Sequence, residues 1–333
     1  MTRVAVVGGG AWGTALADLL ARKGEDVVLW AREPEVVEGI QRSHVNALFL
    51  PDAPLAPGLR ATADPVEAVR GAEVVVSAAP SHAVRAVMSR AAPALAGRPL
   101  VISVSKGIEA DRLQTLSCVL REVLGGGTPI AVLSGPSFAR EVYERQPTAV
   151  VAAAADASVA RRAQQVFSTA HFRVYSHTDV VGVELGGALK NVIALAAGIL
   201  EGLGLGHNTR AALVTRGLAE ITRLGVALGA DPMTFAGLAG LGDLILTATG
   251  ALSRNRSLGV ELGQGKSLEQ ARAGKQSVAE GVNTARTAVA LADRHGVELP
   301  IAREVAAVLF QGKAARQAVA DLMERDLKAE QWR

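Results

Sequence analysis

Residues 4–17 read VAVVGGGAWGTALA, an apolar run followed at once by glycines in the spacing G-x-G-x-x-G. The run predicts a buried strand, and the residues after the glycines predict a helix. Glycines at this turn permit a tight bend, close approach of the backbone to a pyrophosphate and close packing of the helix on the strand. A second strand-like run at 26–30 supplies the context that this motif requires. We therefore predict that Gly8, Gly10 and Gly13 bind a dinucleotide at the start of the helix.

The first half of the chain continues to alternate between strands and helices. Further strand-like runs lie at 73–76, 100–104, 130–133, 148–153 and 172–175. Strands that are apolar on both faces and separated by helices are typical of a parallel sheet covered on both sides. From about residue 180 onward, helical patterns separated by Gly or Pro replace them. We predict an α/β N-terminal Rossmann-like doubly wound sheet over residues 1–180 and an all-α C-terminal domain over residues 181–333.

Composition narrows the function classes. The chain has 333 residues, enough for two domains, and 49% hydrophobic against 3% aromatic residues indicates an aliphatic core. The net charge of +3 comes from scattered residues, so a nucleic-acid partner is not expected. The most apolar stretch, 192–200, lies between Lys190 and Glu201 and is about half as long as a bilayer span. We expect a buried helix there and no membrane span.

Cysteine and histidine usage argues against metal and disulfide chemistry. The single cysteine, Cys118, can form neither an intrachain disulfide nor a cysteine-based zinc site, which is typical of a reducing compartment. The six histidines lack the paired spacing of a zinc hydrolase, so we expect no metal site. The N-terminal residues lack the pattern of a signal peptide, and we expect a cytoplasmic protein.

The end of the second strand bears on the choice of dinucleotide. A site selective for NAD usually places Asp or Glu there, but this sequence has Arg32, with the acid one residue later at Glu33. An arginine can pair with a ribose 2′-phosphate. We predict that NADP(H) is accepted well, with the alternative that Arg32 is a solvated loop residue.

Polar residues follow two later strands and recur in the second half. Lys106 lies at the carboxyl end of a predicted strand, where ligands collect in open α/β sheets. Lys190 lies within an apolar helix, and burial near another cation would lower its pKa toward neutrality, as proton transfer requires. The residues alone leave open whether Lys190 is catalytic or extends to the surface. Ser253, Arg254 and Asn255 suit a phosphate but could equally begin a helix.

Taken together, these segments resemble the bacterial-type NAD(P)-dependent glycerol-3-phosphate dehydrogenases. The resemblance covers nearly the whole chain and lies in the blocks 8–15, 80–85, 106–109, 134–139, 184–191, 242–244, 253–256 and 278–281. It implies an oxidoreductase that reduces dihydroxyacetone phosphate to sn-glycerol 3-phosphate with NADP(H) or NAD(H), reversibly, for phospholipid synthesis. We also expect a homodimer, because a helical domain rich in Gly and Ala allows close helix contacts.

The same resemblance implies roles for individual residues. Lys190 would donate a proton to the nascent alkoxide and accept it in reverse. The residues implied to hold the substrate, besides Lys190, are Lys106, Gly135, Ser137, Asp243, Ser253, Arg254 and Asn255. Those implied to line the dinucleotide, besides the three glycines, are Ala11, Trp12, Arg32, Lys106, Ala139, Arg254, Val278 and Glu280.

Two other functions fit part of the pattern. A dehydrogenase of the 3-hydroxyacid or 6-phosphogluconate type also joins a Rossmann domain to a helical domain that carries a lysine. A catalytically silent NADP(H)-binding module would retain the glycines without needing Lys190, Asp243 and Arg254 together. Their joint presence argues against the silent module.

Overall fold

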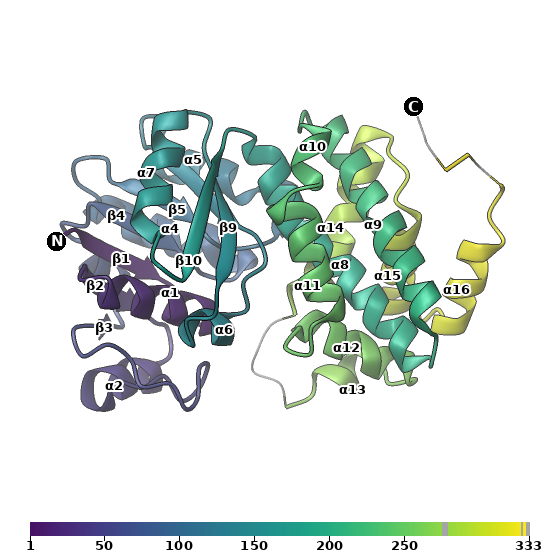
Figure 1. Ribbon diagram of the computed structural model, residues 1–333, viewed down its shortest axis with the longest axis horizontal. Helices are drawn as coiled ribbons and strands as arrows, with labels where there is room; N and C mark the ends of the chain where they lie inside the picture. The colour runs from purple at the N-terminus through teal and green to yellow at the C-terminus, as the bar shows by residue number, and fades with distance from the viewer. Residues whose placement is uncertain (275–278, 328, 331–333) are drawn as a thin grey trace.

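The first strand and helix form where the glycine motif predicts them. The computed structural model describes residues 1–274, 279–327 and 329–330. Strand β1 (Arg3–Val7) turns through the glycines into α1 (Ala11–Arg22), and β2 (Asp26–Trp30) then pairs with β1 in parallel. Figure 1 shows the sheet with its helices beside a second, helical part of the chain. The predicted fold class, a Rossmann-like sheet followed by a helical part, is confirmed.

One large sheet forms the N-terminal part, in the order β10-β9-β8-β5-β4-β1-β2-β3. Its remaining strands are β3 (Arg60–Thr62), β4 (Val74–Ser77), β5 (Leu100–Ser103), β8 (Ile130–Ser134), β9 (Thr148–Ala153) and β10 (Phe172–His177). The chain runs outward from β1 to one side through β2 and β3, and to the other side through β4, β5 and β8. The order therefore reverses between β1 and β4, which is where ligands bind in such sheets.

The last two strands run opposite to the rest. Strand β9 pairs with β8 in antiparallel orientation, whereas β10 is parallel to β9. The connection from β8 to β9 contains only the short helix α6 (Ala139–Tyr143), so the chain re-enters the sheet at the edge it has just left. The sequence correctly placed both strands in the sheet, but the parallel arrangement that it predicted is wrong for the pair β8 and β9.

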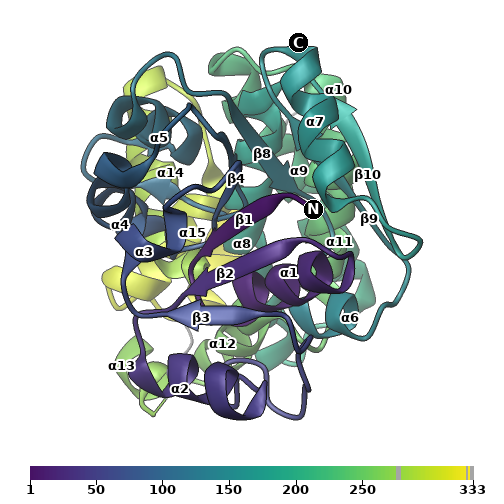
Figure 2. The ribbon, with the colours of Figure 1, turned by 90° about the vertical axis from the view of Figure 1, so that its left-hand side faces the viewer.

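Helices cover both faces of the sheet, as the apolar strands predicted. Val4 and Val6 of β1 belong to one buried layer, and Ala5 and Val7 belong to the other. Figure 2 shows α3, α4 and α5 on one side of the sheet and α1 and α7 on the other. The bounds are α2 (Pro34–Ser43), α3 (Pro65–Val69), η1 (Ser81–Ala83), α4 (Val84–Ala91), η2 (Ala92–Ala94), α5 (Leu116–Leu124) and α7 (Ala157–Phe167). A small hairpin, β6 (Ile108–Glu109) with β7 (Gln114–Thr115), precedes α5.

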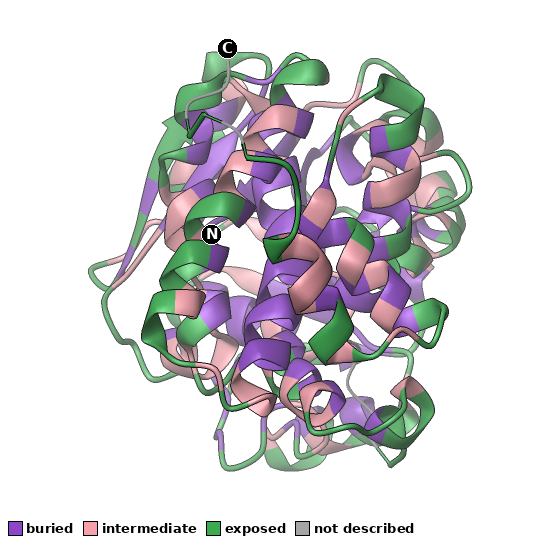
Figure 3. Ribbon diagram, turned by 90° about the vertical axis from the view of Figure 1, so that its right-hand side faces the viewer, coloured by how far each residue is buried: buried purple, intermediate pink, exposed green. Residues whose placement is uncertain are grey.

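The second part is built around α8 (Val180–Gly202), which has Asp179 as its N-cap. This helix has the length and composition of a membrane span, but 83% of its most apolar window is buried inside the protein. It is the buried core helix that the sequence predicted. Around it lie α9 (His207–Ala227), α10 (Pro232–Phe235), η3 (Leu238–Gly242), α11 (Asp243–Thr249), α12 (Arg254–Gly263), α13 (Leu268–Arg272), α14 (Glu280–His295), α15 (Pro300–Phe310) and α16 (Ala315–Met323). Figure 3 shows this part from outside, with exposed residues on its outer helices and buried residues within.

Glycines let α8 and α12 approach closely. A Cβ atom at Gly198 would lie 2.0 Å from the carbonyl oxygen of Arg256, and one at Gly259 would lie 2.2 Å from that of Leu195. The two backbones are therefore nearly in contact, which side chains of any size would prevent. These small residues are used for packing within the chain.

Candidate active site

The candidate site begins at the point where β1 and β4 diverge. Gly8 follows β1 with φ +136°, and a Cβ atom there would lie 2.6 Å from the carbonyl group of Ala78. Gly13 lies on α1, and a Cβ atom there would come within 1.9 Å of the Gly8 carbonyl oxygen. Both positions therefore require glycine, one for its backbone conformation and both for close approach.

Helix α1 is left open at its N-terminus. Its N-cap is Gly10, which makes no side-chain cap, and its first turn has no acidic residue. The space where a Cβ of Gly10 would lie is open. Because the first N–H groups of a helix have no partner within the helix, this end can receive the pyrophosphate of a dinucleotide. Ala11 and Trp12 belong to this first turn, so the residues present fit the group that the motif predicted.

Two lysines meet one carboxylate beyond the carboxyl end of β5. Lys190 on α8 is 6% exposed, and its Nζ donates to Oδ1 of Asp243 and, over 2.6 Å, to Oγ1 of Thr247. Lys106 Nζ lies 2.6 Å from the other Asp243 oxygen, Oδ2, and donates to the carbonyl oxygen of Gly135 over 2.9 Å. Asp243, which is fully buried, thus bridges both ammonium groups.

This arrangement changes the acidity of Lys190. The pKa of Lys190 is lowered from the ordinary 10.5 to about 7, chiefly by burial and also by the neighbouring Lys106, while Asp243 opposes both effects. A lysine with this pKa can hold or release a proton near neutral pH. Because Lys190 is buried, the alternative that it extends to the surface is excluded.

Two glycines place Lys190 against the sheet. Gly186 and Gly187 precede Lys190 by about one helical turn, so they share its face of α8. A Cβ atom at Gly187 would lie 2.4 Å from Oγ of Ser134, the last residue of β8, and one at Gly186 would lie 2.6 Å from the carbonyl oxygen of Ala239. Without side chains at these positions, α8 can approach the end of β8 closely enough for Lys190 to reach the site.

The loop after β8 lies in the same place. Gly135 has φ +134°, and a Cβ there would lie 3.0 Å from the backbone of Val150. The Ser137 hydroxyl donates to the Gly135 carbonyl oxygen over 2.9 Å. Ala139 then begins α6. The Gly135 carbonyl, bonded by both Ser137 and Lys106, therefore ties this loop to the lysine pair.

Ser253, Arg254 and Asn255 begin α12. Ser253 is the N-cap, and its Oγ accepts from the backbone N–H of Arg256 over 3.2 Å, so the helix-start alternative holds for this residue. Asn255 is buried; it donates to Oδ1 of Asn191 over 2.9 Å and accepts from Gly281 N over 2.9 Å. Arg254, by contrast, is exposed and can meet a ligand.

Glu280 connects the two parts of the chain. At the start of α14, it accepts from Ser81 N over 3.1 Å and from Ser81 Oγ over 2.6 Å. It also acts electrostatically on Arg254. Ser81 lies in η1, a few residues after β4, so this contact joins the start of α14 to the carboxyl end of the sheet.

The structure does not show two other predicted residues at the lysine cluster. Arg32 is exposed, and its guanidinium pairs with Glu33 over 2.6 Å, outside the lysine cluster. Val278 lies outside the described residues.

Two residues next to the lysine cluster were not among the predicted site residues. Thr247 follows Asp243 by four residues on α11, a spacing that places both on one helix face and that could have indicated it. Asn191 follows Lys190 in the same apolar helix. Its contact with Asn255 depends on the close packing of α8 and α12, which no local pattern shows.

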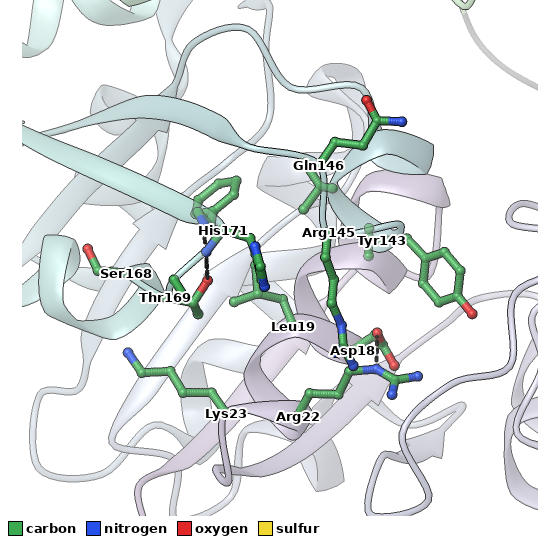
Figure 4. Close-up of a pocket in the computed structure, with 14 residues that line it drawn as sticks. Asp18, Leu19, Arg22, Lys23, Tyr143, Arg145, Gln146, Ser168, Thr169 and His171 are labelled. Atoms are coloured by element: carbon green, nitrogen blue, oxygen red, sulfur yellow. Dashed lines mark hydrogen bonds and ion pairs between the residues drawn. The ribbon is translucent and has the colours of Figure 1, made fainter.

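A separate hollow lies on the sheet part. Figure 4 shows this cavity of about 380 Å³, lined by α1, α6 and the start of β10, with Lys23, Arg145 and His171 at its rim. None of the predicted site residues lines it.

Comparisons with known proteins cover nearly the full chain. Residues 3–160 match the family described as NAD-dependent glycerol-3-phosphate dehydrogenase N-terminus, and residues 179–320 match the corresponding C-terminus family. A glycerol-3-phosphate dehydrogenase (NAD(P)+) of Geobacter sulfurreducens is 57% identical over 99% of both chains. Another from Nitratidesulfovibrio vulgaris is 54% identical over 98% of this chain and 100% of its own. The crystal structure of glycerol-3-phosphate dehydrogenase from Coxiella burnetii superposes with a TM-score of 0.94 at 39% identity, over 97% of this chain and 99% of that one.

Proposed function

The chain belongs to the NAD-dependent glycerol-3-phosphate dehydrogenase family, and on that premise we propose that it reduces dihydroxyacetone phosphate to sn-glycerol 3-phosphate with NADPH or NADH. The observation that carries the proposal is the buried Lys190, with a pKa of about 7, held by Asp243 beside Lys106. The reaction is reversible, and its product serves phospholipid synthesis.

The nicotinamide cofactor supplies the hydride when it is bound. Negative charge then develops on the ketone oxygen, and Lys190 Nζ stabilises that charge and transfers a proton to it. In the reverse direction, neutral Lys190 takes the proton from the hydroxyl. Asp243 orients the lysine through Oδ1, and Thr247 accepts a second hydrogen bond from Nζ. Lys106 keeps a second positive charge next to Lys190, which lowers the pKa of Lys190.

The other predicted site residues surround this centre. We assign the substrate phosphate to Arg254, supported by its exposed position in the first turn of α12. Gly135 and Ser137 hold the substrate through the loop after β8, and Ser253 through the start of α12. We assign the dinucleotide to Gly8, Gly10, Gly13, Ala11 and Trp12 around the open end of α1, and to Lys106, Ala139, Arg254 and Glu280. Val278, which the resemblance also implies, lies outside the described residues.

Selectivity for NADPH is assigned to Arg32. Its guanidinium is exposed and, within the part of the chain that the structure describes, pairs with the adjacent Glu33, so it can turn toward a 2′-phosphate. We expect Arg32→Ala to lower kcat/KM for NADPH by about tenfold, since hydrogen bonds to a charged group contribute about 1.5–3 kcal/mol, and to leave kcat/KM for NADH near its starting value. Steady-state rates with each cofactor measure this, and an unchanged NADPH-to-NADH ratio would remove Arg32 from the site.

We also propose the division into a dinucleotide-binding domain, 1–180, and a helical substrate-binding domain, 181–333. Strand β10 ends at His177 and α8 begins at Val180, which supports this boundary. A homodimer is supported by exposed apolar side chains on the helical part, among them Met233 and Leu252; light scattering after size exclusion tests it. The single cysteine, Cys118, supports a cytoplasmic location.

The decisive experiment is a steady-state assay with dihydroxyacetone phosphate and each reduced cofactor. We expect oxidation of NADPH that depends on dihydroxyacetone phosphate, and no comparable rate with 3-hydroxyacids or 6-phosphogluconate as substrates of the reverse reaction. Lys190→Ala should lose about 10²–10⁴-fold in turnover while it still binds NADPH. Near-normal turnover of this variant would exclude Lys190 from the mechanism, and the absence of any substrate-dependent oxidation would leave the silent NADP(H)-binding module.

A further inference from the structure

Asn46 is a buried amide that is not among the predicted site residues. It lies in loop 44–59, between α2 and β3, and is fully buried. Its Nδ2 donates to the carbonyl oxygen of Gly9 over 2.9 Å and to Oγ1 of Thr14 over 2.8 Å, and its Oδ1 accepts from Phe49 N over 3.1 Å. Burying an amide is costly unless it is bonded in this way.

Asn46 and Thr14 act on the same carbonyl group. The hydroxyl of Thr14 accepts from Asn46 and itself donates to the Gly9 carbonyl oxygen over 3.2 Å. The peptide between Gly9 and Gly10 is trans, so its C=O and N–H point in opposite directions. Holding the Gly9 carbonyl toward the protein interior therefore directs the Gly10 N–H outward, toward the open end of α1.

Loop 44–59 is anchored along the length of α1. The N–H of Ala56 donates to Asp18 Oδ1 over 2.7 Å, and the carbonyl oxygen of Pro54 accepts from Arg22 over 2.8 Å and from Tyr143 over 2.9 Å. Figure 4 shows Asp18 and Arg22 joined on this side of α1. The loop that carries Asn46 is thus held in place by several hydrogen bonds, and so is the Asn46 side chain.

We propose that Asn46 is a positioning residue for the dinucleotide, which orients the glycine turn through the Gly9 carbonyl so that the turn presents its N–H groups to the pyrophosphate. This rests on the dinucleotide site of the proposed function. Thr14 is its partner in the same role.

The experiment compares two ligands by equilibrium titration. NADPH carries the pyrophosphate, whereas 2′-AMP carries the adenosine 2′-phosphate without it. We expect Asn46→Ala to raise the Kd of NADPH by about tenfold and to leave the Kd of 2′-AMP within about twofold. At saturating NADPH, kcat with dihydroxyacetone phosphate should stay within about twofold. Gln164→Ala, which removes another amide-to-carbonyl bond on the sheet part, is the control and should change neither Kd.

Thr14 supplies a second pair of variants if Asn46→Ala does not fold. Thr14→Val removes the hydroxyl and should raise the Kd of NADPH. Thr14→Ser retains the hydroxyl and should leave this Kd unchanged. In the double variant Asn46→Ala with Thr14→Val, the Kd of NADPH should rise by less than the product of the two single effects, because both side chains act on the Gly9 carbonyl. The proposal would be overturned if the Kd of NADPH did not change in these variants, or if the Kd values of NADPH and 2′-AMP rose equally. Independent effects of the two substitutions on the Kd of NADPH would overturn it too. A wild-type protein that binds NADPH but does not oxidise it with dihydroxyacetone phosphate would instead contradict the proposed function.

Discussion

At the scale of single residues, the site depends on one carboxylate shared by two lysines. Asp243 is fully buried and bonds Lys190 through one oxygen and Lys106 through the other. Burial disfavours the charge on Lys190 and Lys106 repels it, so one carboxylate is not enough to keep the pKa of Lys190 at its ordinary value. Lys190 can therefore exchange a proton near neutral pH, as its proposed role requires.

This pKa predicts opposite pH dependences for the two directions of the reaction. Reduction needs protonated Lys190, so kcat/KM for dihydroxyacetone phosphate should be level below pH about 7 and fall about tenfold per pH unit above it. Oxidation of sn-glycerol 3-phosphate needs neutral Lys190, so its kcat/KM should rise with pH through the same range.

Rate profiles from pH 5.5 to 9 measure both limbs. The residual activity of Lys190→Ala is the control, and its kcat/KM should not change with pH around pH 7 in either direction. A pair of profiles that both rise or both fall through pH 7 would contradict the assignment.

At the scale of elements, two contacts decide how the helices of the second part are arranged. One is the glycine-lined crossing of α8 and α12, where backbone meets backbone. The other is a carboxylate on α9, Glu220, which accepts from the N–H groups of Ile301 over 2.8 Å and Ala302 over 3.3 Å at the start of α15. The crossing of α8 and α12 leaves no room for an added atom. The contact between α9 and α15 depends on the protonation state of Glu220.

The glycine crossing predicts a large effect of a single methyl group. Gly259→Ala places Cβ 2.2 Å from the Leu195 carbonyl oxygen and 2.9 Å from the Gly198 Cα, and neither backbone atom can move without shifting α8. We expect a loss of about 3 kcal/mol or more in the free energy of unfolding. Gly206→Ala, at an open N-cap position, is the control and should cost less than about 1 kcal/mol. Denaturant unfolding compares them, and equal stabilities would refute the close crossing.

Glu220 predicts a stability that falls with pH. Burial raises its pKa from 4.5 to about 7 in the folded protein, against the two backbone bonds and the charges of Arg223 and Arg325, which lower it. Between pH 4.5 and 7 the folded state therefore binds more protons than the unfolded state, and this contribution to stability decreases as pH rises. Below pH 4.5 it is complete, and above pH 7 the cost of burying the charge is fully present.

Glu220→Gln removes the titration. The difference in unfolding free energy between wild type and this variant should fall by on the order of 3 kcal/mol from pH 4.5 to 7.5. Chemical unfolding at each pH measures it. A difference that stays constant across this range would show that Glu220 keeps its ordinary pKa.

At the scale of the whole molecule, three carboxylates of the helical part reach across to the sheet part. Asp243 bonds Lys106, Glu280 bonds Ser81, and Glu184 on α8 accepts from Ser117 N over 2.8 Å and from the Ser117 hydroxyl. Asp243 and Glu280 belong to the proposed site, so two of the contacts that join the two parts lie within that site. Glu184 instead contacts the start of α5, where its carboxylate accepts a hydrogen bond from an N–H group that has no partner within that helix.

Glu184 therefore tests the junction without touching the ligands. Glu184→Ala leaves the Ser117 N–H without its acceptor, and we expect a loss of about 1–3 kcal/mol in the free energy of unfolding. Burial already raises the pKa of Glu184, so the neutral Glu184→Gln, which can still accept one bond, should lose clearly less. Thermal and denaturant unfolding distinguish them. If both variants are as stable as wild type, this contact does not hold the parts together.

Local patterns in the sequence were sufficient for the fold class, and they singled out Lys106 and Lys190, which the structure brings together on Asp243. The glycine spacing, the apolar strand runs and the change to helical patterns near residue 180 are local, since each reflects the geometry of one turn, strand or helix. They predicted β1, β2, β4, β5, β8, β9 and β10 close to where they lie. The three-residue β3 was missed, because a strand that short leaves no recognisable period.

Contacts between distant segments were beyond the sequence alone, because they depend on how the elements pack. The sequence by itself determined that Lys190 lies in an apolar helix, whereas only the tertiary structure decided that it is buried against Asp243 and not extended to solvent. The same holds for the antiparallel β9, for Thr247 and for Asn46, which meets the glycine turn 37 residues away in the chain. Residue type sets which chemistry is available, and packing sets the burial and the partners that give each group its pKa and its orientation.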